Sequence, residues 1–395
     1  MVVVGASLAG LRAVETLRQH GYDGRLVLVG AEPSLPYDRP PLSKQVLAGE
    51  WGPDEIVLRP ADDYSSLALD MRLGRRATAL DLDARAVVLD DGERVAFDGL
   101  VIATGCRPRL LPGTPDIAGI HVLRTLDDAL AIRAALDAAA RVVVIGAGFI
   151  GSEVAATCRM SGLDVTLLEA LPVPLARALG DEMGAACAEL HRDNGVDLRV
   201  VVAPAGFDGD EQVERVRLSD GSAIDADVVV VGVGVAPETA WLEGSGLALG
   251  DGVLCDASCF ASAPGVVAAG DVARWHNPLF GVDMRVEHWT NAAEQGMAAA
   301  RALLAGAGAE PFAPVPYFWS DQYDAKIQFV GTCAPDDEVR IVHGSVAERR
   351  FVAIYGRAGR LVGALALSRP RLLVAYRRLI AERASWEDAL AHEPT

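Results

Sequence analysis

The chain is 395 residues long and carries 54 acidic and 36 basic side chains, which gives a formal net charge of −18 at pH 7. A chain this acidic lacks the basic surface that phosphate binding needs, so we expect no nucleic-acid partner. Its hydrophobic content of 51% is typical of a globular protein, and its length exceeds what one hydrophobic core serves, so we expect two or three domains.

Nothing in the sequence predicts insertion into a membrane. No stretch approaches the roughly 20 apolar residues that span a bilayer. The opening residues, Met-Val-Val-Val-Gly, lack the basic, apolar and cleavage regions of a secretory signal. We therefore expect a cytoplasmic protein without a membrane partner.

Six cysteines are scattered through the chain, at positions 106, 158, 187, 255, 259 and 333. The scatter fits reduced cytosolic thiols, and no spacing resembles a zinc site or a four-cysteine iron–sulfur cluster, so we expect no metal in this chain. Only two of the 36 basic residues are lysines, Lys44 and Lys326, which draws attention to each.

Residues 2–32 have the pattern of a nucleotide-binding strand–turn–helix–strand unit. An apolar strand, Val2–Val4, runs into the turn GASLAG (5–10), and apolar residues at helical spacing follow. A second strand, Arg25–Val29, then leads to Glu32.

Each small residue of this turn has a physical role. Gly5 allows the tight turn, Ser7 lets the backbone approach a pyrophosphate, and Gly10 lets the helix pack closely on the strand. The N-terminus of the helix attracts phosphate, and the carboxylate of Glu32 can bind a ribose. Ser7 departs from the pattern, in which the second position is usually glycine.

Residues 141–170 repeat the pattern with a complete glycine fingerprint. Gly146, Gly148 and Gly151 lie between two predicted strands, Val142–Ile145 and Val165–Leu168. Glu169, 23 residues after Gly146, is placed to bind the ribose hydroxyls of an adenosine. A carboxylate there repels a 2′-phosphate, so we expect NADH to be preferred over NADPH.

One such fingerprint is weak evidence, because structural glycine turns produce it often. Two complete units in one chain are harder to obtain by accident. They favour two nucleotide sites, one for a bound flavin and one for a nicotinamide.

Six further motifs follow in order: PYDRPPLSK (36–44), LVIATG (100–105), VGVGVAP (231–237), VAAGDVA (267–273), EHWTNAAEQG (287–296) and YFWSDQY (317–323). With these motifs the sequence resembles the FAD/NAD-dependent ferredoxin reductases of oxygenase systems, over nearly the whole chain. That family belongs to the pyridine nucleotide-disulphide oxidoreductase superfamily, which is related to glutathione reductase.

The resemblance implies an α/β fold with two Rossmann-like dinucleotide-binding domains, arranged as in glutathione reductase, plus a C-terminal α+β domain. The FAD-binding domain would comprise residues 1–112 and 238–312, the NAD-binding domain 113–237, and the C-terminal domain 313–395. The local sequence agrees, because strand-like segments at 326–331, 339–343, 350–355 and 361–367 precede a predicted helix after Pro370. Residues 356–359 are typical of a hairpin connection.

The resemblance also assigns the residues that hold each nucleotide. Those implied at FAD are Gly5, Ser7, Leu8, Ala9, Gly10, Glu32, Arg39, Lys44, Ala77, Ala103, Thr104, Gly105, Arg124, Gly270, Asp271, Glu287, His288 and Trp289. Those implied at NAD are Gly146, Gly148, Phe149, Ile150, Gly151, Glu153, Glu169 and Gly234. Asp271 would bind a ribityl hydroxyl of the flavin, although a capping aspartate after Gly270 would be placed in the same way.

Four residues are implied at the place of hydride transfer: Lys44, Glu153, Trp289 and Trp319. We predict an ion pair between Lys44 and Glu153 beside the flavin N5 edge, where fixed charge acts strongly because water is scarce. Trp289, at the start of a predicted helix (Thr290–Leu304), and Trp319 would wall the flavin ring, and packing alone is the alternative for each. No general acid or nucleophile is needed, because alignment of the two rings suffices.

The electron acceptor follows from a missing thiol. Relatives that reduce disulfides carry a redox cysteine beside the flavin, but no cysteine precedes Cys106 here, and we interpret Cys255 and Cys259 as structural thiols of the core or near the surface. Electrons must then pass directly to an external acceptor. A one-electron [2Fe-2S] ferredoxin on a separate chain fits, and would feed a cytochrome monooxygenase or a Rieske dioxygenase.

The segment 340–383 reverses the charge of the chain. Between residues 339 and 383 there are ten arginines and two glutamates. Ferredoxins are usually acidic, so we expect one to dock on this segment. The alternative is that these arginines pair with the acidic remainder of the protein. We expect a monomer from the family.

Other roles stay open. A reductase of rubredoxin or of small organic acceptors is not separated from a ferredoxin reductase by sequence. An NADH oxidase or peroxidase relies on the absent cysteine. A flavin-containing NADH sensor of the apoptosis-inducing-factor kind is a different class, in which turnover is secondary.

Overall fold

The computed structural model describes residues 1–392, and its contacts group the chain into two compact units. The first unit contains residues 1–38, 54–107 and 236–316, and the second contains 39–53, 108–235 and the chain from 317 onward. Two short strands, Cys106–Pro108 (β8) and Val235–Pro237 (β17), lie where the chain passes from one unit to the other. The division into three domains stays a prediction.

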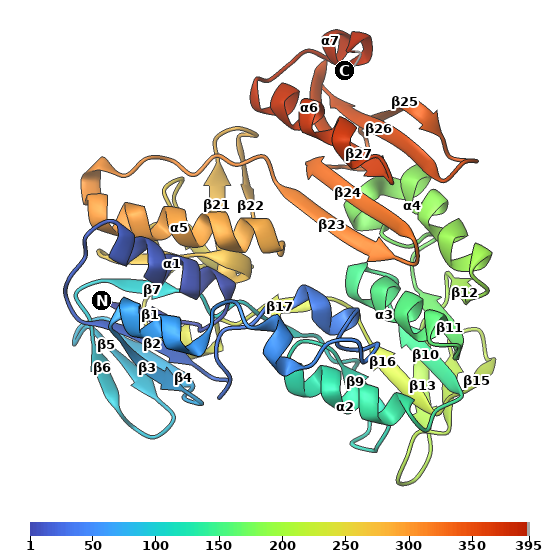
Figure 1. The fold of residues 1–395 in the computed structure, drawn as a ribbon, viewed down its shortest axis with the longest axis horizontal. Coiled ribbons are helices and arrows are strands. Elements are labelled where there is room, and N and C mark those ends of the chain that lie inside the picture. The colour runs from blue at the N-terminus through green and yellow to red at the C-terminus, as the bar shows by residue number, and fades with distance from the viewer. Residues whose placement is uncertain (393–395) are drawn as a thin grey trace. The chain divides into compact units, whose positions relative to one another are not determined.

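A five-stranded parallel sheet forms the centre of the first unit, in the order β20-β7-β1-β2-β3. Its strands are Val266–Ala268 (β20), Leu100–Ile102 (β7), Val2–Val4 (β1), Leu26–Gly30 (β2) and Leu69–Leu73 (β3). Helices α1 (Leu8–Gln19) and α5 (Trp289–Ala305) lie side by side on one face of this sheet (Figure 1).

Alternate residues of β20, β7, β1 and β2 contribute to two separate cores, as the two-residue period of a strand requires. Val3 packs with α1 and α5, whereas Val2 and Val4 pack into the core on the opposite face. Because both faces are covered, these four strands are apolar throughout, whereas the edge strand β3 carries Asp70 and Arg72. The residues of three motifs follow the carboxyl ends of β1, β7 and β20, so these motifs lie at one edge of the sheet.

Two smaller sheets complete the first unit. An antiparallel sheet contains Ala77–Asp81 (β4), Ala86–Leu89 (β5) and Arg94–Ala96 (β6). A second sheet contains Leu249–Gly250 (β18), Gly252–Cys255 (β19), Ala273–Asn277 (β21) and Val282–Met284 (β22).

The second unit contains another parallel sheet, in the order β12-β11-β10-β16-β9. Its strands are Asp197–Val200 (β12), Asp164–Glu169 (β11), Arg141–Ile145 (β10), Val228–Val231 (β16) and Ile120–Val122 (β9). Its helices are Leu126–Leu136 (α2), Phe149–Met160 (α3) and Ala176–Asp193 (α4). A small antiparallel sheet contains Pro204–Asp208 (β13), Arg215–Leu218 (β14) and Ala223–Asp225 (β15).

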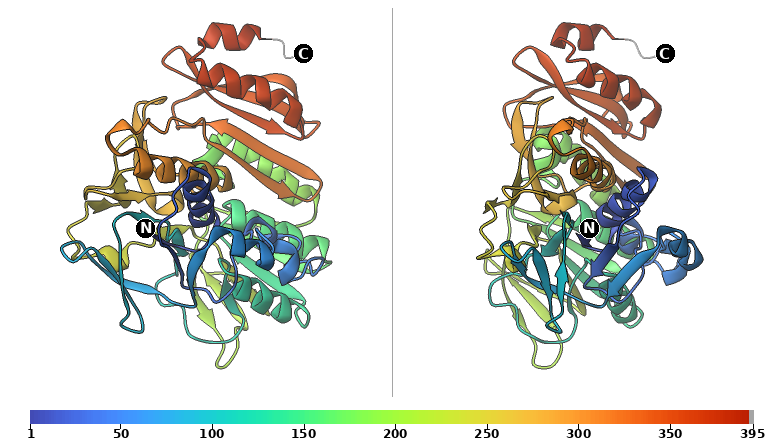
Figure 2. Two further views of the ribbon diagram at one scale, coloured as in Figure 1. Left: turned by 60° about the vertical axis from the view of Figure 1, so that its left-hand side comes forward. Right: turned by 90° about the vertical axis from the view of Figure 1, so that its left-hand side faces the viewer.

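The C-terminal part of the second unit is an antiparallel sheet in the order β23-β24-β27-β26-β25. Its strands are Tyr317–Gln322 (β23), Ala325–Gly331 (β24), Glu338–Ser345 (β25), Arg350–Arg357 (β26) and Arg360–Leu367 (β27). Helix α6 (Pro370–Ala381) packs along β24 and β27 (Figure 2), and α7 (Trp386–Ala391) follows. The predicted hairpin is confirmed, because Ala358 and Gly359 both have positive φ in the two-residue turn between β26 and β27.

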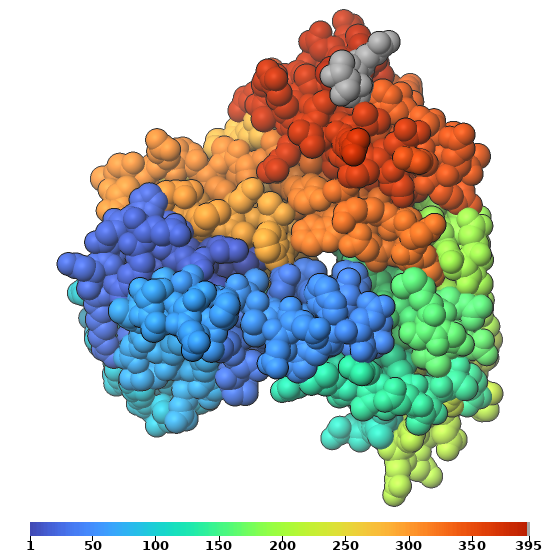
Figure 3. Space-filling model, in the orientation of Figure 1, coloured from blue at the N-terminus to red at the C-terminus, as the bar shows by residue number. Residues whose placement is uncertain are grey.

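The segment 39–53 belongs to the second unit, although it lies far from the rest of that unit in the sequence. Its short 3-10 helix, Pro40–Ser43 (η1), packs on α2 and α3. In the space-filling view of Figure 3, the blue atoms of this part of the chain lie against the blue-green atoms of the region that contains α2. Leu47 enters the core that is built on Val142, Val144 and Val154. This packing brings Lys44 to the helix that follows the second glycine fingerprint.

The predicted fold class is confirmed: two Rossmann-like parallel sheets and a C-terminal antiparallel sheet are present. Within residues 1–392, no helix has the length and apolarity to cross a membrane.

A buried histidine of α4 lies against the turn between β23 and β24. His191 has no exposed surface, and its Nδ1 lies 2.9 Å from the hydroxyl oxygen of Tyr323. Burial lowers the pKa of the imidazole to about 4 from 6.5. His191 is therefore neutral in the folded protein at pH 7.

This burial predicts a loss of stability in acid. Between pH 6.5 and about 4 the unfolded chain binds the proton and the folded chain does not, so His191 destabilises the fold as the pH falls through this window, by on the order of 3 kcal/mol in total. The variant His191→Gln keeps a polar partner for Tyr323 but cannot titrate. We expect its melting temperature to fall less than that of the wild type between pH 7 and about pH 4.5. An equal fall in both proteins would contradict this origin.

Candidate active site

The first glycine fingerprint forms a turn with no room for a side chain at Gly5 or Gly10. Gly5 has a φ of +119°, and a Cβ on it would lie 2.0 Å from the carbonyl oxygen of Ala103. A Cβ on Gly10 would lie 1.8 Å from the carbonyl oxygen of Gly5. These approaches hold the start of α1, with Ser7 as its N-cap, at the carboxyl end of β1. The N–H groups of Leu8 and Ala9 in the first turn can therefore bind phosphate.

Two further motifs reach the same edge of the first sheet. Ala103 follows β7, and its N–H donates to the carbonyl of Val4 at 2.7 Å. Thr104 Oγ1 donates to the carbonyl of Glu238 at 2.8 Å, and the carbonyl of Gly105 accepts the N–H of Glu238 at 2.9 Å. Gly270, after β20, has a φ of +76° and donates its N–H to Gln295 Oε1.

Asp271 is held by neighbours that sequence reasoning missed. Arg285 Nη1 donates to the carbonyl oxygen of Asp271 at 3.1 Å, and the Cys106 thiol lies 3.5 Å from Oδ2 of the same residue. Arg285 also pairs with Glu287 at 2.6 Å. One arginine thus links two residues that are implied at the flavin.

The start of α5 carries two more residues of that set. Trp289 Nε1 donates to Asp38 Oδ1 at 2.6 Å, which fixes the orientation of the indole. Burial lowers the pKa of His288, the N-cap residue, to about 4, so the ring is neutral at pH 7 and adds no charge there.

Two remaining residues lie farther along the unit. Glu32, beyond β2, accepts a short hydrogen bond from the Tyr37 hydroxyl. Ala77 is buried at the start of β4, in the core that contains Val87 and Leu89.

The second fingerprint has the same geometry. Gly146 has a φ of +99°, and a Cβ on it would lie 2.4 Å from the carbonyl oxygen of Gly232. A Cβ on Gly151 would lie 1.9 Å from the carbonyl oxygen of Gly146. Gly148, the N-cap of α3, instead faces open space: apart from its chain neighbours and the backbone of its own helix, no atom of residues 1–392 lies within 4 Å of an added Cβ. That space leaves room for a pyrophosphate at the helix N-terminus.

Glu169 lies at the end of β11 with its carboxylate fixed. Its Oε2 accepts the N–H of Ala147 at 2.8 Å, and its Oε1 accepts the N–H of Leu171 at 2.9 Å. Each oxygen keeps lone pairs for a further donor. The carboxylate is thus held against the fingerprint turn.

Three other residues implied at NAD surround this turn. Phe149 begins α3, and its ring lies 4.5 Å from that of Phe318 between centroids. Ile150 is an exposed apolar residue of the first helical turn. Gly234, with a φ of +96°, accepts the N–H of Arg109 at 2.9 Å.

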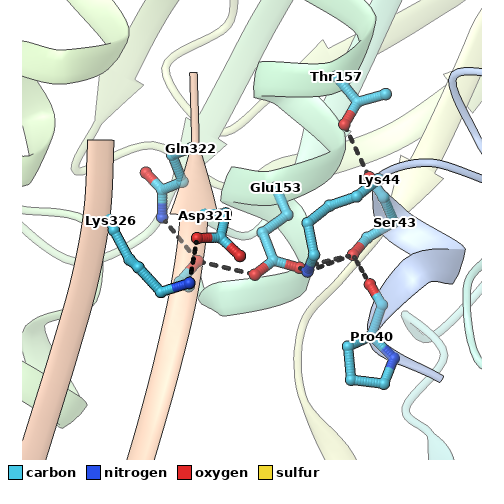
Figure 4. A network of polar contacts seen from close by, with 9 residues as sticks. Pro40, Ser43, Lys44, Glu153, Thr157, Asp321, Gln322 and Lys326 are labelled. Carbon is cyan, nitrogen blue, oxygen red and sulfur yellow. Dashed lines mark hydrogen bonds and ion pairs between the residues drawn. The ribbon is translucent and has the colours of Figure 1, made fainter. Parts of the chain in front are cut away.

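The predicted ion pair between Lys44 and Glu153 is confirmed. Lys44 Nζ lies 2.6 Å from Glu153 Oε2, and both side chains are largely buried (Figure 4). Arg39 and Arg124 also meet, because Arg39 Nη1 donates to the carbonyl of Arg124 at 2.5 Å. Arg39, Lys44 and Arg124 belong to the second unit, whereas the other residues implied at the flavin belong to the first.

Sequence reasoning missed the hydroxyl groups around Glu153. Ser43 Oγ donates to Glu153 Oε2 at 2.5 Å, and Ser320 Oγ donates to Oε1 at 2.8 Å. The alternation along β23 contained the signal for Ser320: residues 318, 320 and 322 are buried, so a serine and a glutamine occupy inward positions that are usually apolar.

The two tryptophans occupy different settings. Trp289 belongs to the first unit, and Trp319 to β23 of the second. Trp319 stacks on Tyr317, with the centroids 6.1 Å apart. Their placement at a flavin stays a prediction.

The C-x-x-x-C pair has the character of structural thiols. Cys259 is fully buried and Cys255 partly so. Burial raises the pKa of Cys255 to about 12 and raises that of Cys259 still further, so neither is a thiolate at neutral pH.

The residues at both fingerprints fit dinucleotides. At each parallel sheet a strand ends in a turn whose first and last glycines have no room for a side chain, followed by a helix N-terminus and, farther on, a carboxylate. Glu32 and Glu169 are those carboxylates, and ribose hydroxyls suit them. FAD in the first unit and a nicotinamide nucleotide in the second are what these donors can hold.

Comparison with known proteins identifies the family. Residues 1–296 match the model for pyridine nucleotide-disulphide oxidoreductases, and residues 317–395 match that for the reductase C-terminal domain. The chain is 38% identical over 397 residues to the ferredoxin–NAD(+) reductase component of the anthranilate 1,2-dioxygenase system of Burkholderia cepacia, covering 100% of this chain and 97% of that protein. It is 36% identical to putidaredoxin reductase of Pseudomonas putida, covering 97% and 92%.

A solved structure agrees over the same length. The covalent putidaredoxin reductase–putidaredoxin complex matches with a TM-score of 0.94 at 34% identity, covering 99% of this chain and 95% of that one. The chain therefore belongs to the pyridine nucleotide-disulphide oxidoreductase family. Within that family it is an FAD-dependent oxidoreductase with NADH as its second cofactor.

The two glycines of the second fingerprint should respond differently to alanine. In Gly151→Ala the new methyl group meets a carbonyl oxygen at 1.9 Å, so we expect a lower melting temperature. In Gly148→Ala the methyl enters open space and should leave the melting temperature within about 2 °C, yet obstruct the pyrophosphate and raise the KM for NADH about tenfold or more. Thermal melting and steady-state kinetics check both. A Gly148→Ala enzyme with an unchanged KM would argue against nucleotide binding at this turn.

Proposed function

We propose that this protein is an NADH-dependent ferredoxin reductase, which delivers electrons singly to a [2Fe-2S] ferredoxin that supplies a cytochrome monooxygenase or a Rieske dioxygenase. FAD, when bound, would accept a hydride from the nicotinamide and pass its two electrons on one at a time. The observation that carries the proposal is the pair of glycine turns on two parallel sheets, together with the buried Lys44–Glu153 pair.

The chain's own residues have three tasks in this reaction. The turns at 5–10 and 146–151 would each bind the pyrophosphate of one dinucleotide, and this binding would supply the free energy that orients its ring. Lys44 places a positive charge that Glu153 holds in position, because a lysine side chain is otherwise mobile. Trp289 and Trp319 would exclude water from the rings.

Preference for NADH over NADPH is supported by Glu169. Its carboxylate is held by two backbone N–H groups, so it cannot turn away from an incoming 2′-phosphate without losing both hydrogen bonds. The next two residues, Ala170 and Leu171, bring no positive charge. A 2′-phosphate would therefore meet repulsion without compensation.

The acceptor is supported by the thiol chemistry and by relatives. Cys255 and Cys259 are protonated at neutral pH, and Cys259 is fully buried, so they offer no relay to a disulfide substrate. Two relatives are named as reductases that serve a dioxygenase system and putidaredoxin.

Anaerobic titration tests the reaction. We expect NADH to bleach the flavin absorbance of the FAD-loaded protein, and NADPH to do so at least about tenfold less efficiently. Mixing with a [2Fe-2S] ferredoxin from the same organism should then restore the flavin colour, with two ferredoxins reduced per flavin. Rubredoxin in a parallel mixture distinguishes that acceptor. Absence of bleaching by NADH would refute the proposal, and NADH-induced dimerisation without electron transfer would favour the sensor.

We also propose that ferredoxin docks on the basic segment 340–383. Four of its arginines form ion pairs within the protein, which for those four supports pairing with acidic residues of this chain and not docking. The pairs are Arg340 with Glu338, Arg349 with Asp193, Arg357 with Asp337 and Arg378 with Glu382. Arg350, Arg360 and Arg371 are exposed, and none has an acidic partner within residues 1–392. These three are the better candidates for a docking surface.

Charge reversal at these three positions tests the docking surface. The variant with Arg350→Glu, Arg360→Glu and Arg371→Glu should show a KM for ferredoxin raised about tenfold at low salt, because long-range attraction is lost. Its NADH–ferricyanide activity should be unchanged. Arg76→Glu, an exposed arginine of the first unit, is the matched control. An unaltered KM in the triple variant would place docking elsewhere.

Three further statements about this chain remain proposals: the division into FAD-binding, NAD-binding and C-terminal domains at the boundaries given above, the monomeric state, and the cytoplasmic location.

A further inference from the structure

The carboxylate of Glu153 receives hydrogen bonds from two segments far apart in the sequence. Glu153 is 4% exposed. Its Oε2 is bound by Lys44 Nζ at 2.6 Å and by Ser43 Oγ at 2.5 Å, both from the segment 39–53 (Figure 4). Its Oε1 is bound by Ser320 Oγ at 2.8 Å, from β23 of the C-terminal sheet.

The direction of the Ser320 hydrogen bond is fixed by its neighbour. Gln322 Nε2 donates to Ser320 Oγ at 3.2 Å, and an amide N–H can only donate. The single hydroxyl proton of Ser320 is therefore left for Glu153. Ser320 and Gln322 are both fully buried, so no solvent competes for these bonds.

Helix α3 also holds the segment that carries Ser43 and Lys44, the two donors to Glu153 Oε2. Thr157, one turn after Glu153, donates its Oγ1 to the backbone carbonyl of Ser43 at 2.8 Å. The residues at 153 and 157 thus hold the segment that carries Lys44 at two points. Ser320, on β23, donates to Oε1, whereas Lys44 binds Oε2.

We propose that Ser320 is a positioning residue for the Lys44–Glu153 pair: by binding Oε1 it fixes the carboxylate so that Oε2 stays directed at the Lys44 ammonium. This inference rests on the proposed function, in which that ammonium assists hydride transfer. It gives the C-terminal sheet a part in the first half of the reaction, before any acceptor binds.

The energetic reason is the cost of a buried charge. A buried carboxylate oxygen without a donor loses its hydration and gains nothing in return. Without the Ser320 hydroxyl, the carboxylate would rotate to share its remaining donors between both oxygens. The carboxylate and Lys44 would then adopt several arrangements, and the Lys44 ammonium would no longer be held in one position.

The chain provides a matched control on the same helix. Ser152 precedes Glu153, is fully buried, and its hydroxyl has no hydrogen-bond partner among the described residues. Ser152→Ala therefore removes the same group from the same interior without touching the carboxylate. Ser320→Ala removes the Oε1 donor, and Ser320→Thr keeps it.

The scarcity of lysine permits a readout that needs no turnover. Lys44 and Lys326 are the only lysines of the chain, so trace acetylation by acetic anhydride, followed by mass spectrometry, gives the reactivity of Lys44 relative to Lys326. We expect Ser320→Ala to raise this ratio about threefold to tenfold, because a less ordered carboxylate releases the amine. Ser320→Thr and Ser152→Ala should leave the ratio at the wild-type value.

Flavin reduction by NADH provides the second readout, in a stopped-flow instrument without ferredoxin. We expect Ser320→Ala to lower the limiting rate constant about tenfold and to change the half-saturating NADH concentration less than twofold, since Ser320 is not placed at the nucleotide. Ser320→Thr should restore the rate. In a Glu153→Ala background the Ser320 substitution should have no further effect on either readout.

The outcomes separate the two levels of inference. An unchanged Lys44 ratio in Ser320→Ala, a Thr variant as impaired as the Ala variant, or an undiminished Ser320 effect in the Glu153→Ala background would each overturn the positioning role. Wild-type flavin that NADH does not reduce would overturn the proposed function, while the acetylation ratio still decides the positioning. If Ser320→Ala does not fold, Ser320→Cys replaces it, because a thiol keeps the shape of serine but donates only weakly.

Discussion

The geometry of both nucleotide sites depends on one steric constraint, the contact between the first turn of a helix and the glycine that ends a parallel strand. At Gly10 and at Gly151 the space for a Cβ is filled by a backbone oxygen less than 2 Å away. The helix is therefore seated against its strand, and its N-terminus lies at the edge where the strand ends. This contact places the N–H groups of the first helical turn where a pyrophosphate can bind, near the carboxylate that follows the second strand.

A second constraint acts on the reaction itself. A buried ion pair is costly, and it persists only where further hydrogen bonds satisfy the charged atoms. Glu153 meets this condition with donors from α3's neighbours in the segment 39–53 and from β23. One carboxylate thus binds donors from two stretches that are separated by more than 250 residues and that both pack on the same helix.

The sequence predicted turns and other features that depend on neighbouring residues, but few contacts between residues far apart in the chain. The turns at 5–10 and 146–151, the position of Glu169 and the hairpin at Ala358 follow from short-range stereochemistry, so the sequence was sufficient. The Lys44–Glu153 pair came from family resemblance, because no spacing rule connects residues 109 positions apart. The alternation along β23 predicts that Ser320 is buried, but not that it binds Glu153. That contact and the pairing of Arg349 with Asp193 depend on how β23 and α4 pack, which the sequence does not show.

The boundaries of the units show the same limit. A reading along the chain groups the segment 39–53 with the strands on either side of it, yet its contacts belong with α2 and α3. Its short 3-10 helix has little sequence signal, and Leu47 gains its place only from a core that is assembled by residues beyond position 130. Such excursions are decided by tertiary packing, which a local pattern does not encode.

The carboxylate of Glu169 links nucleotide choice to the architecture of the turn. The same two oxygens that would discriminate against a phosphorylated ribose also satisfy the amides of Ala147 and Leu171. A lineage that exchanged this residue to accept the other nicotinamide coenzyme would leave two N–H groups in need of new acceptors. A change of coenzyme selectivity at Glu169 would therefore also destabilise the turn, unless a second substitution supplied acceptors for these two N–H groups.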